Sequence, residues 1–252
     1  MKIVVCVKRV PATDSRIKIA ADGTSLDTAS IEWILSPYDE FALETALRIK
    51  DAAADTEVVV LCLGPAEATK ELRTCLAMGA DRAIHLKDDG ANAHDAQVTS
   101  GLLADAITGE SPDLVLCGKL AADRDQGQVG LLLSYRLGYP CVTEARELGL
   151  EDGKAVAKRA AGGGNSETWE LPLPALVTIT KGEYEPRYAS LKGIMAAKKK
   201  PIDERDVSAP AETITVKAME LPAERQAGRI VGEGAEAVGE LVRLLREEAK
   251  VI

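Results

Sequence analysis

Residues 3–7 read Ile-Val-Val-Cys-Val, an unbroken apolar run that is rich in β-branched side chains. Such a run is typical of a strand that is buried on both faces of a parallel sheet. The pattern returns at residues 58–63, 83–86, 114–117 and 175–179, and segments with helical spacing of apolar residues separate the runs. This alternation predicts an α/β fold with a doubly wound, mostly parallel, Rossmann-like sheet.

The expected helices carry start signals in their first residues. At the first of them, Ser36 can cap the helix, Pro37 suits its first turn, and Asp39 can complete a capping-box-like exchange. Further helices are expected from near residue 65, over residues 95–108, and from near residue 125 to residue 138. Two hairpins are expected to interrupt the winding, one around Asp22-Gly23 and one within residues 146–171.

The composition excludes several classes of protein. The chain has 252 residues, of which 46% are hydrophobic and 28% charged, a balance that is typical of soluble globular proteins. A net charge of -9 disfavours nucleic acid as a partner, and no apolar run approaches the ~20 residues that membrane insertion needs. The 5 cysteines are irregularly spaced, which argues against a disulfide framework or a metal site and favours a reducing, cytoplasmic compartment.

The part of the chain after Pro201 differs from the part before it. Residues 202–230 are polar and interrupted by prolines, which predicts an extended arm rather than a further domain. A final amphipathic helix follows, and its apolar face carries Val238, Leu241, Val242 and Leu245. The fold class therefore includes a C-terminal extended arm and helix.

The segment after the apolar run at residues 114–117 is the richest candidate for a ligand site, because open α/β sheets bind ligands at the carboxyl ends of their strands. Gly118 lets the backbone approach a ligand, and residues 126–130 can offer N–H groups at a helix N-terminus. The expected loop residues are Gly118, Lys119, Asp123, Asp125, Gln126, Gly127, Gln128, Val129 and Gly130. Asp123 and Asp125 can bind ribose hydroxyls or cap the helix. From these residues alone, a nucleotide site and an ordinary connecting loop stay equally open.

The sequence shows no catalytic constellation. There is no P-loop, and the first strand is not followed by G-x-G-x-x-G. A match to the G-x-G-x-x-A variant at residues 232–237 is interpreted as a flexible approach to the last helix. His85, His94 and Cys75 are interpreted as structural. These observations predict a binding subunit rather than an enzyme with its own catalytic site.

A set of short motifs runs along the chain in order. It comprises Val7-Lys8-Arg9-Val10, Ser36-Pro37-Tyr38-Asp39-Glu40, Gly64-Pro65, residues 75–82, the loop Asp123-x-Asp125-x-x-Gln128-x-Gly130, and residues 186–200. Together these motifs resemble the small (beta) subunit of electron-transfer flavoproteins, over nearly the whole chain.

The resemblance implies a heterodimer. Its large (alpha) subunit holds most of a redox-active FAD, which the two subunits share, and the small subunit buries AMP. It also implies electron transfer from acyl-CoA dehydrogenases of fatty acid β-oxidation, or related dehydrogenases, to a quinone oxidoreductase or another acceptor. One alternative is an electron-bifurcating relative that oxidises NADH and holds a second FAD in place of AMP, because residues 123–130 are close to its D-G-D-x-x-Q-V-G loop. A second alternative is a stand-alone nucleotide-binding module of the same fold.

The resemblance also assigns residues to these roles. Contacts to AMP are implied by position for Cys6, Ser36, Leu63 and the loop at residues 118–130. The partner-recognition residues are Tyr188, Leu191, Ile194 and Met195, and Leu191 is expected at the tip of a docking loop as the apolar anchor. We therefore expect residues 1–190 to form the nucleotide-binding domain. Residues 191–252 then supply the recognition loop and an arm that packs on the large subunit.

Overall fold

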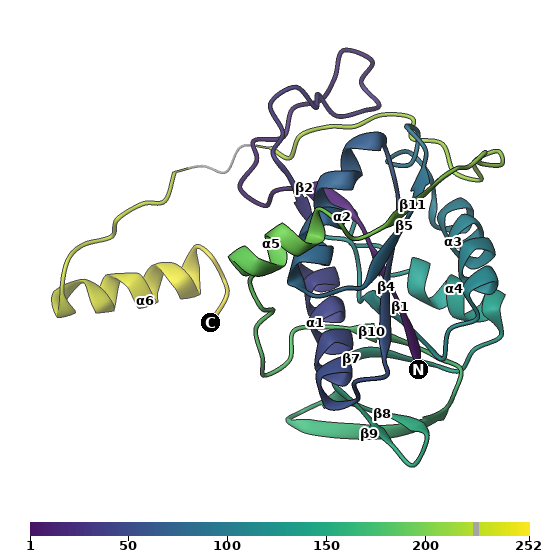
Figure 1. The fold of residues 1–252 in the computed structure, drawn as a ribbon. Helices are drawn as coiled ribbons and strands as arrows, with labels where there is room; N and C mark the ends of the chain where they lie inside the picture. The colour runs from purple at the N-terminus through teal and green to yellow at the C-terminus, as the bar shows by residue number, and fades with distance from the viewer. Residues whose placement is uncertain (224–226) are drawn as a thin grey trace.

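A nine-stranded sheet forms the centre of the computed structural model, which describes residues 1–223 and 227–252. The strands lie in the order β11-β5-β4-β1-β6-β10-β7-β8-β9. Pairing is parallel from β11 to β7, and β8 and β9 add an antiparallel hairpin beyond β7. Helices lie on both faces of the parallel part (Figure 1). The structure thus confirms the predicted doubly wound α/β fold.

The apolar runs of the sequence form the middle of this sheet. They are β1 (Lys2–Val7), β4 (Glu57–Gly64), β5 (Arg82–Lys87), β6 (Leu114–Gly118) and β10 (Ala175–Ile179). Side chains of β1 alternate between the faces, so that Ile3 and Val5 join one core cluster and Val4 joins the other. Because helices bury both faces, each of residues 3–7 in this strand is apolar.

The helices divide between these two clusters. One face is covered by α1 (Pro37–Ala52) and α2 (Thr69–Met78), which follows a single turn η1 (Ala66–Ala68), and the other face by α3 (Ala96–Glu110) and α4 (Val129–Leu137). At the start of α3, the Asp95 carboxylate accepts a hydrogen bond of 2.9 Å from the Val98 N–H. This side-chain cap fixes the helix start that the sequence predicted near residue 95.

The start of α1 differs from the predicted capping box. Ser36 precedes the helix, but its hydroxyl makes no capping hydrogen bond and is buried without a partner among the described residues. The Asp39 carboxylate instead accepts hydrogen bonds from the backbone N–H groups of Lys8 and Gly118. The capping-box prediction was therefore wrong, because two strand ends compete for the same carboxylate.

The start of α4 lies later than predicted. The sequence placed it near Asp125, whereas the helix begins at Val129. Asp125 has a φ of 49° and Gly127 a φ of 61°, and both values belong to the left-handed region. A right-handed helix cannot include them, so the loop continues to Gln128.

The predicted hairpins have different outcomes. Around Asp22-Gly23 the structure has a turn with a single bridge between Ile19 and Leu26, and no pair of extended strands. The second region forms β7 (Cys141–Glu151), β8 (Lys154–Gly162) and β9 (Asn165–Pro172), of which β8 and β9 pair around the glycines. A small separate sheet joins β2 (Arg9–Pro11) and β3 (Trp33–Leu35).

The C-terminal part contributes elements of its own. They are α5 (Leu191–Ala197), β11 (Ile202–Asp206), the turn η2 (Ala235–Ala237) and α6 (Val238–Glu247). β11 pairs with β5, so the predicted arm adds an edge strand to the sheet, and the boundary at residue 190 stays a prediction. Figure 1 shows α6 apart from the sheet, and on its apolar face Val238, Leu241 and Val242 are exposed. No helix in the described part of the chain is long and apolar enough to cross a lipid bilayer.

Candidate functional site

A cavity lies at the carboxyl ends of β1, β4 and β6. β1 pairs with β4 on one side and with β6 on the other, so the chain winds in opposite directions from this point. Ligands of doubly wound sheets bind at such a switch point. The predicted site residues that line the cavity are Cys6, Leu63, Gly118, Lys119, Gln126, Gly127, Gln128, Val129 and Gly130.

Three predicted site residues lie outside this lining. Ser36 is fully buried beside the start of α1. Asp123 forms an ion pair with Lys8 at 2.6 Å, and Asp125 is exposed on the loop. Their contact with a ligand stays a prediction.

Asp39 is a cavity residue that the sequence assigned to helix capping. Its carboxylate accepts hydrogen bonds of 2.8 Å from the Lys8 N–H and 3.1 Å from the Gly118 N–H. It thereby holds the ends of β1 and β6 at a fixed separation. Burial raises the pKa of the Asp39 carboxyl to about 7, although the two amide hydrogen bonds and the Lys8 charge act in the opposite direction.

Glycines allow a close approach of backbone in this region. A Cβ on Gly118 would lie 2.4 Å from the Asp39 carboxylate, and a Cβ on Gly130 would lie 2.7 Å from Thr178 Cγ2. No side chain fits at either position without a shift of its neighbours. Gly130 thus lets α4 start directly above β10, with its first N–H groups beside the cavity.

The strand ends at the floor of the cavity carry two cysteines. Cys6 and Cys117 are register partners on β1 and β6, and both line the cavity. A hydrogen bond from Cys6, together with burial, raises the pKa of the Cys117 thiol well above its ordinary value. The Cys117 thiol therefore stays protonated and contributes an uncharged surface.

The rim of the cavity carries three basic side chains, of which Lys8 is paired with Asp123. Lys8, Lys119 and Arg124 line it, and the Lys119 ammonium lies 5.0 Å from the centre of the Tyr38 ring. The Arg124 guanidinium donates a hydrogen bond of 2.7 Å to the His94 carbonyl, and a second hydrogen bond to the Asn92 carbonyl. Arg124 thereby ties the loop after β6 to the loop after β5.

His94 also lines the cavity, which the sequence did not indicate. Its imidazole lies between the carboxylates of Asp88 and Glu212. Glu212 is 118 residues away from His94. No local sequence pattern predicts a contact between residues that are so far apart in the chain. His85, by contrast, is fully buried and its Nε2 lies 3.1 Å from the carbonyls of Gly64 and Pro65, in agreement with a structural role.

The predicted recognition residues form an exposed apolar patch. Tyr188 is 96% exposed, Leu191 85%, Ile194 44% and Met195 63%. Leu191 is not at the tip of a loop as predicted, because it is the first residue of α5. The Ser190 hydroxyl accepts a hydrogen bond of 3.0 Å from the Gly193 N–H and caps this short helix.

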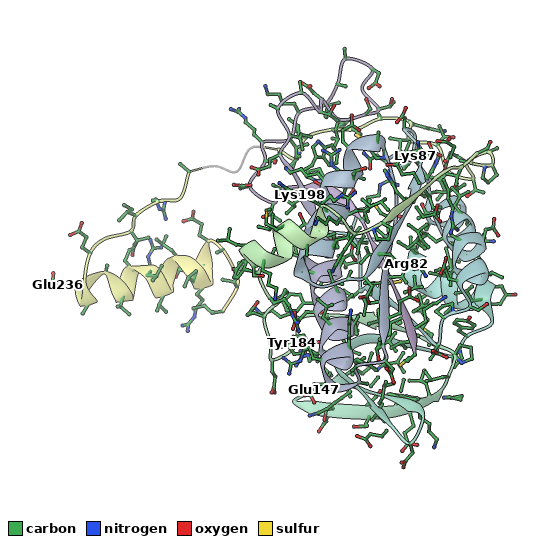
Figure 2. All side chains as sticks on the ribbon, in the orientation of Figure 1. Arg82, Lys87, Glu147, Tyr184, Lys198 and Glu236 are labelled. Atoms are coloured by element: carbon green, nitrogen blue, oxygen red, sulfur yellow. The ribbon has the colours of Figure 1, made fainter. Side chains whose placement is uncertain are left out.

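The segment before α5 is fastened to α1. The Arg187 guanidinium donates hydrogen bonds of 2.7 and 3.0 Å to the buried Glu44 carboxylate. Tyr184, which is labelled in Figure 2, lies against α1 and shares a hydrogen bond with Thr45. The exposed patch therefore stands on a rigid base rather than on a free loop.

The fold and the cavity together define a doubly wound α/β protein with a cavity at the switch point of its sheet. The family model described as electron transfer flavoprotein domain matches residues 24–210. The chain therefore belongs to the electron transfer flavoprotein family.

Its relatives agree with this assignment. The electron transfer flavoprotein subunit beta of Bradyrhizobium diazoefficiens is 39% identical over 252 residues, which is 100% of each chain. The subunit of the same name from Bacillus subtilis is 39% identical over 261 residues, again 100% of each chain. The caffeyl-CoA reductase-Etf complex subunit CarD of Acetobacterium woodii is 42% identical over 203 residues, 80% of this chain and 77% of the relative. Membership of the family assigns the chain a role in electron transfer and implies a flavin and an alpha-subunit partner.

Proposed function

We propose that this chain is the small subunit of a heterodimeric electron-transfer flavoprotein, and that it binds AMP in the cavity at the switch point. The observation that carries the proposal is the make-up of this cavity. Cysteines lie at its floor, its rim carries Lys119 and Arg124 with Lys8 paired to Asp123, and the first N–H groups of α4 lie beside it. A thiol-lined floor suits a purine base, and an amide-rich rim with these cations suits a phosphate.

The residues that line the cavity support the choice of AMP. The α4 N-terminus, with the loop at residues 126–130, would hold the phosphate through backbone N–H groups and the helix dipole. Lys119 would add a charge-assisted hydrogen bond. Cys6 and Leu63 would pack against the base. The FAD that is shared with the large subunit supplies the electron-carrying group.

The exposed patch on α5 is the proposed docking site for the electron donor, an acyl-CoA dehydrogenase of fatty acid β-oxidation or a related dehydrogenase. Leu191 would be its anchor, since an apolar side chain that is 85% exposed gains most from burial in a partner. A single anchor on a fixed helix suits a contact that forms and breaks quickly. Electrons would then pass to a quinone oxidoreductase or another acceptor.

The arm and α6 are the proposed contact with the large subunit. Val238, Leu241 and Val242 form an exposed apolar face on α6, at helical spacing. Burial of such a face on a partner stabilises the complex of the two chains. A chain that functioned alone would leave this apolar face exposed to water. This face therefore favours a subunit over a stand-alone nucleotide-binding module.

The second candidate is the small subunit of an electron-bifurcating flavoprotein that oxidises NADH and carries a second FAD in place of AMP. The similarity to the caffeyl-CoA reductase-Etf complex subunit and the Gln-Val-Gly at residues 128–130 favour it. Arg124 stands where the D-G-D-x-x-Q-V-G loop has glycine, and its side chain lines the cavity. Because Arg124 departs from this loop pattern, AMP is our first choice.

Co-expression with the large subunit tests the proposal. The purified heterodimer should be yellow, and its flavin absorbance should fall when an acyl-CoA and its dehydrogenase are added. A chain that stays monomeric beside the large subunit, or a heterodimer whose flavin is not reduced, would contradict it. We also propose a cytoplasmic location, since all 5 cysteines are free thiols.

A further inference from the structure

The C-terminal arm is fastened to one wall of the cavity. This wall is the loop between β5 and α3, in which the His94 imidazole lies between two carboxylates. His94 Nε2 is 2.8 Å from Asp88, and Nδ1 forms a hydrogen bond with Glu212 of the arm. The other oxygen of Glu212 accepts a hydrogen bond of 2.7 Å from the Asp95 N–H. A single arm residue thus holds two consecutive residues of the wall.

A second set of contacts runs in the opposite direction. The Asp95 carboxylate accepts hydrogen bonds of 2.7 Å from the Thr213 N–H and 3.1 Å from the Ile214 N–H. The Thr213 hydroxyl donates to the same oxygen. The other Asp95 oxygen caps α3. The wall and the arm therefore bind each other by reciprocal, charge-assisted hydrogen bonds, which are stronger than neutral ones.

The other side of this wall faces the cavity. His94 and Ala96 line the cavity. Arg124, which lies on the loop with the proposed phosphate site, donates a hydrogen bond to the His94 carbonyl. A continuous network of hydrogen bonds thus leads from the arm to the ligand loop. In Figure 1 the arm continues from this region across the top of the molecule toward α6.

We propose that Glu212 and Thr213 are positioning residues of the nucleotide cavity: they hold the His94 wall closed over a bound nucleotide and slow its exchange. This inference rests on the proposed function, since it requires that the cavity binds a nucleotide. Coupling between two sites is reciprocal, so a bound nucleotide also holds the arm in place. The arm that leads to the large subunit and the nucleotide thereby stabilise each other.

The groups that face His94 give the arrangement a pH dependence. The carboxylates of Asp88 and Glu212 contact the imidazole of His94. Asp95 is the next residue in the chain, and the Arg124 guanidinium donates a hydrogen bond to the His94 carbonyl. Burial alone would lower the pKa of His94, but the hydrogen bonds and charges of Asp88 and Glu212 outweigh it and raise the pKa above the ordinary value. The charged imidazole therefore stabilises the wall below the ordinary pKa of histidine. This contribution is lost as the pH rises through the raised pKa.

The test measures exchange of bound AMP against labelled AMP in the purified heterodimer. Glu212→Gln and Thr213→Val should each speed exchange about tenfold, the scale expected for loss of one charge-assisted hydrogen bond. Glu220→Gln is the matched control, because Glu220 is an exposed residue of the same arm. The exchange rate of the unaltered protein should also rise at alkaline pH, and Glu212→Gln should flatten this profile.

Unchanged exchange rates in a heterodimer that does hold AMP would overturn the inference and leave the proposed function standing. A heterodimer without AMP or FAD in this chain would overturn both. If the variants do not assemble, hydrogen exchange of the unaltered heterodimer decides the question. Residues 212–214 should exchange more slowly with AMP bound than after its removal, and equal protection would contradict the proposal.

Discussion

The Asp39 carboxylate joins β1 to β6 at the cavity. Replacement of Asp39 by asparagine removes the negative charge of this carboxylate. The carboxylate accepts hydrogen bonds from the N–H groups of Lys8 and Gly118, and it is 6% exposed. Asparagine has the same shape but a single acceptor oxygen, so its amide NH2 must face one of these donors. Both the charge and one hydrogen bond are therefore lost, and the effect on stability depends on pH.

The magnitude follows from the raised pKa. The pKa of the Asp39 carboxyl is about 7 in the folded chain, against an ordinary value of 3.8. Between these values the folded state binds more protons than the unfolded state, so its stability falls as the pH rises. At ~1.36 kcal/mol per pKa unit, the contribution of Asp39 changes by about 2.5 kcal/mol between about pH 5 and pH 8. This change is a large part of the ~5–15 kcal/mol by which such domains are stable.

Urea unfolding at these two pH values provides the assay. The loss of stability between pH 5 and pH 8 should be about 2.5 kcal/mol smaller in Asp39→Asn than in the unaltered chain. Asp105→Asn is the control, because Asp105 is exposed on α3 and should leave the pH dependence unchanged. An identical pH dependence in Asp39→Asn would refute the assignment of Asp39 as a buried carboxylate that titrates near neutral pH.

Three further substitutions test the docking helix and the cavity. Leu191→Ala should slow electron transfer from the dehydrogenase about 30-fold if the anchor supplies ~2 kcal/mol of binding energy. The heterodimer should still assemble, and Lys192→Ala is the control. Unchanged kinetics would exclude Leu191 as the anchor. Gly193→Ala places a Cβ 2.3 Å from a carbonyl oxygen of α2, so α5 must shift. Urea unfolding should then show a loss of about 1–3 kcal/mol, and equal stability would argue against this close contact. Gly118→Ala places a Cβ 2.4 Å from Asp39 and should lower the AMP content of the heterodimer, whereas full content would show that the cavity tolerates it.

The central strands could be predicted because their signal is local. An unbroken β-branched run such as residues 3–7 has few alternatives once helical segments separate such runs. The loop at residues 118–130 was found for a similar reason, since its glycines follow an apolar run directly. Local sequence was therefore sufficient for the fold and for much of the cavity.

Three of the missed features depend on contacts between distant residues. Asp39 suits a capping box by its spacing, yet Gly118, which is 79 residues away, determines where its carboxylate points. The contact between His94 and Glu212 spans 118 residues. Leu191 was expected in a loop because the family resemblance implies a recognition loop there, whereas packing of α5 on α2 makes it helical. Such contacts become visible only when the fold is known.

The nucleotide content of the purified heterodimer tests the central claim most directly. Ligands released by denaturation would be separated by chromatography and counted against protein. The account predicts a single FAD and a single AMP in each heterodimer. Two FAD molecules without AMP would contradict the assignment of AMP to this cavity, and a heterodimer with no nucleotide besides the shared FAD would contradict the role of the cavity itself.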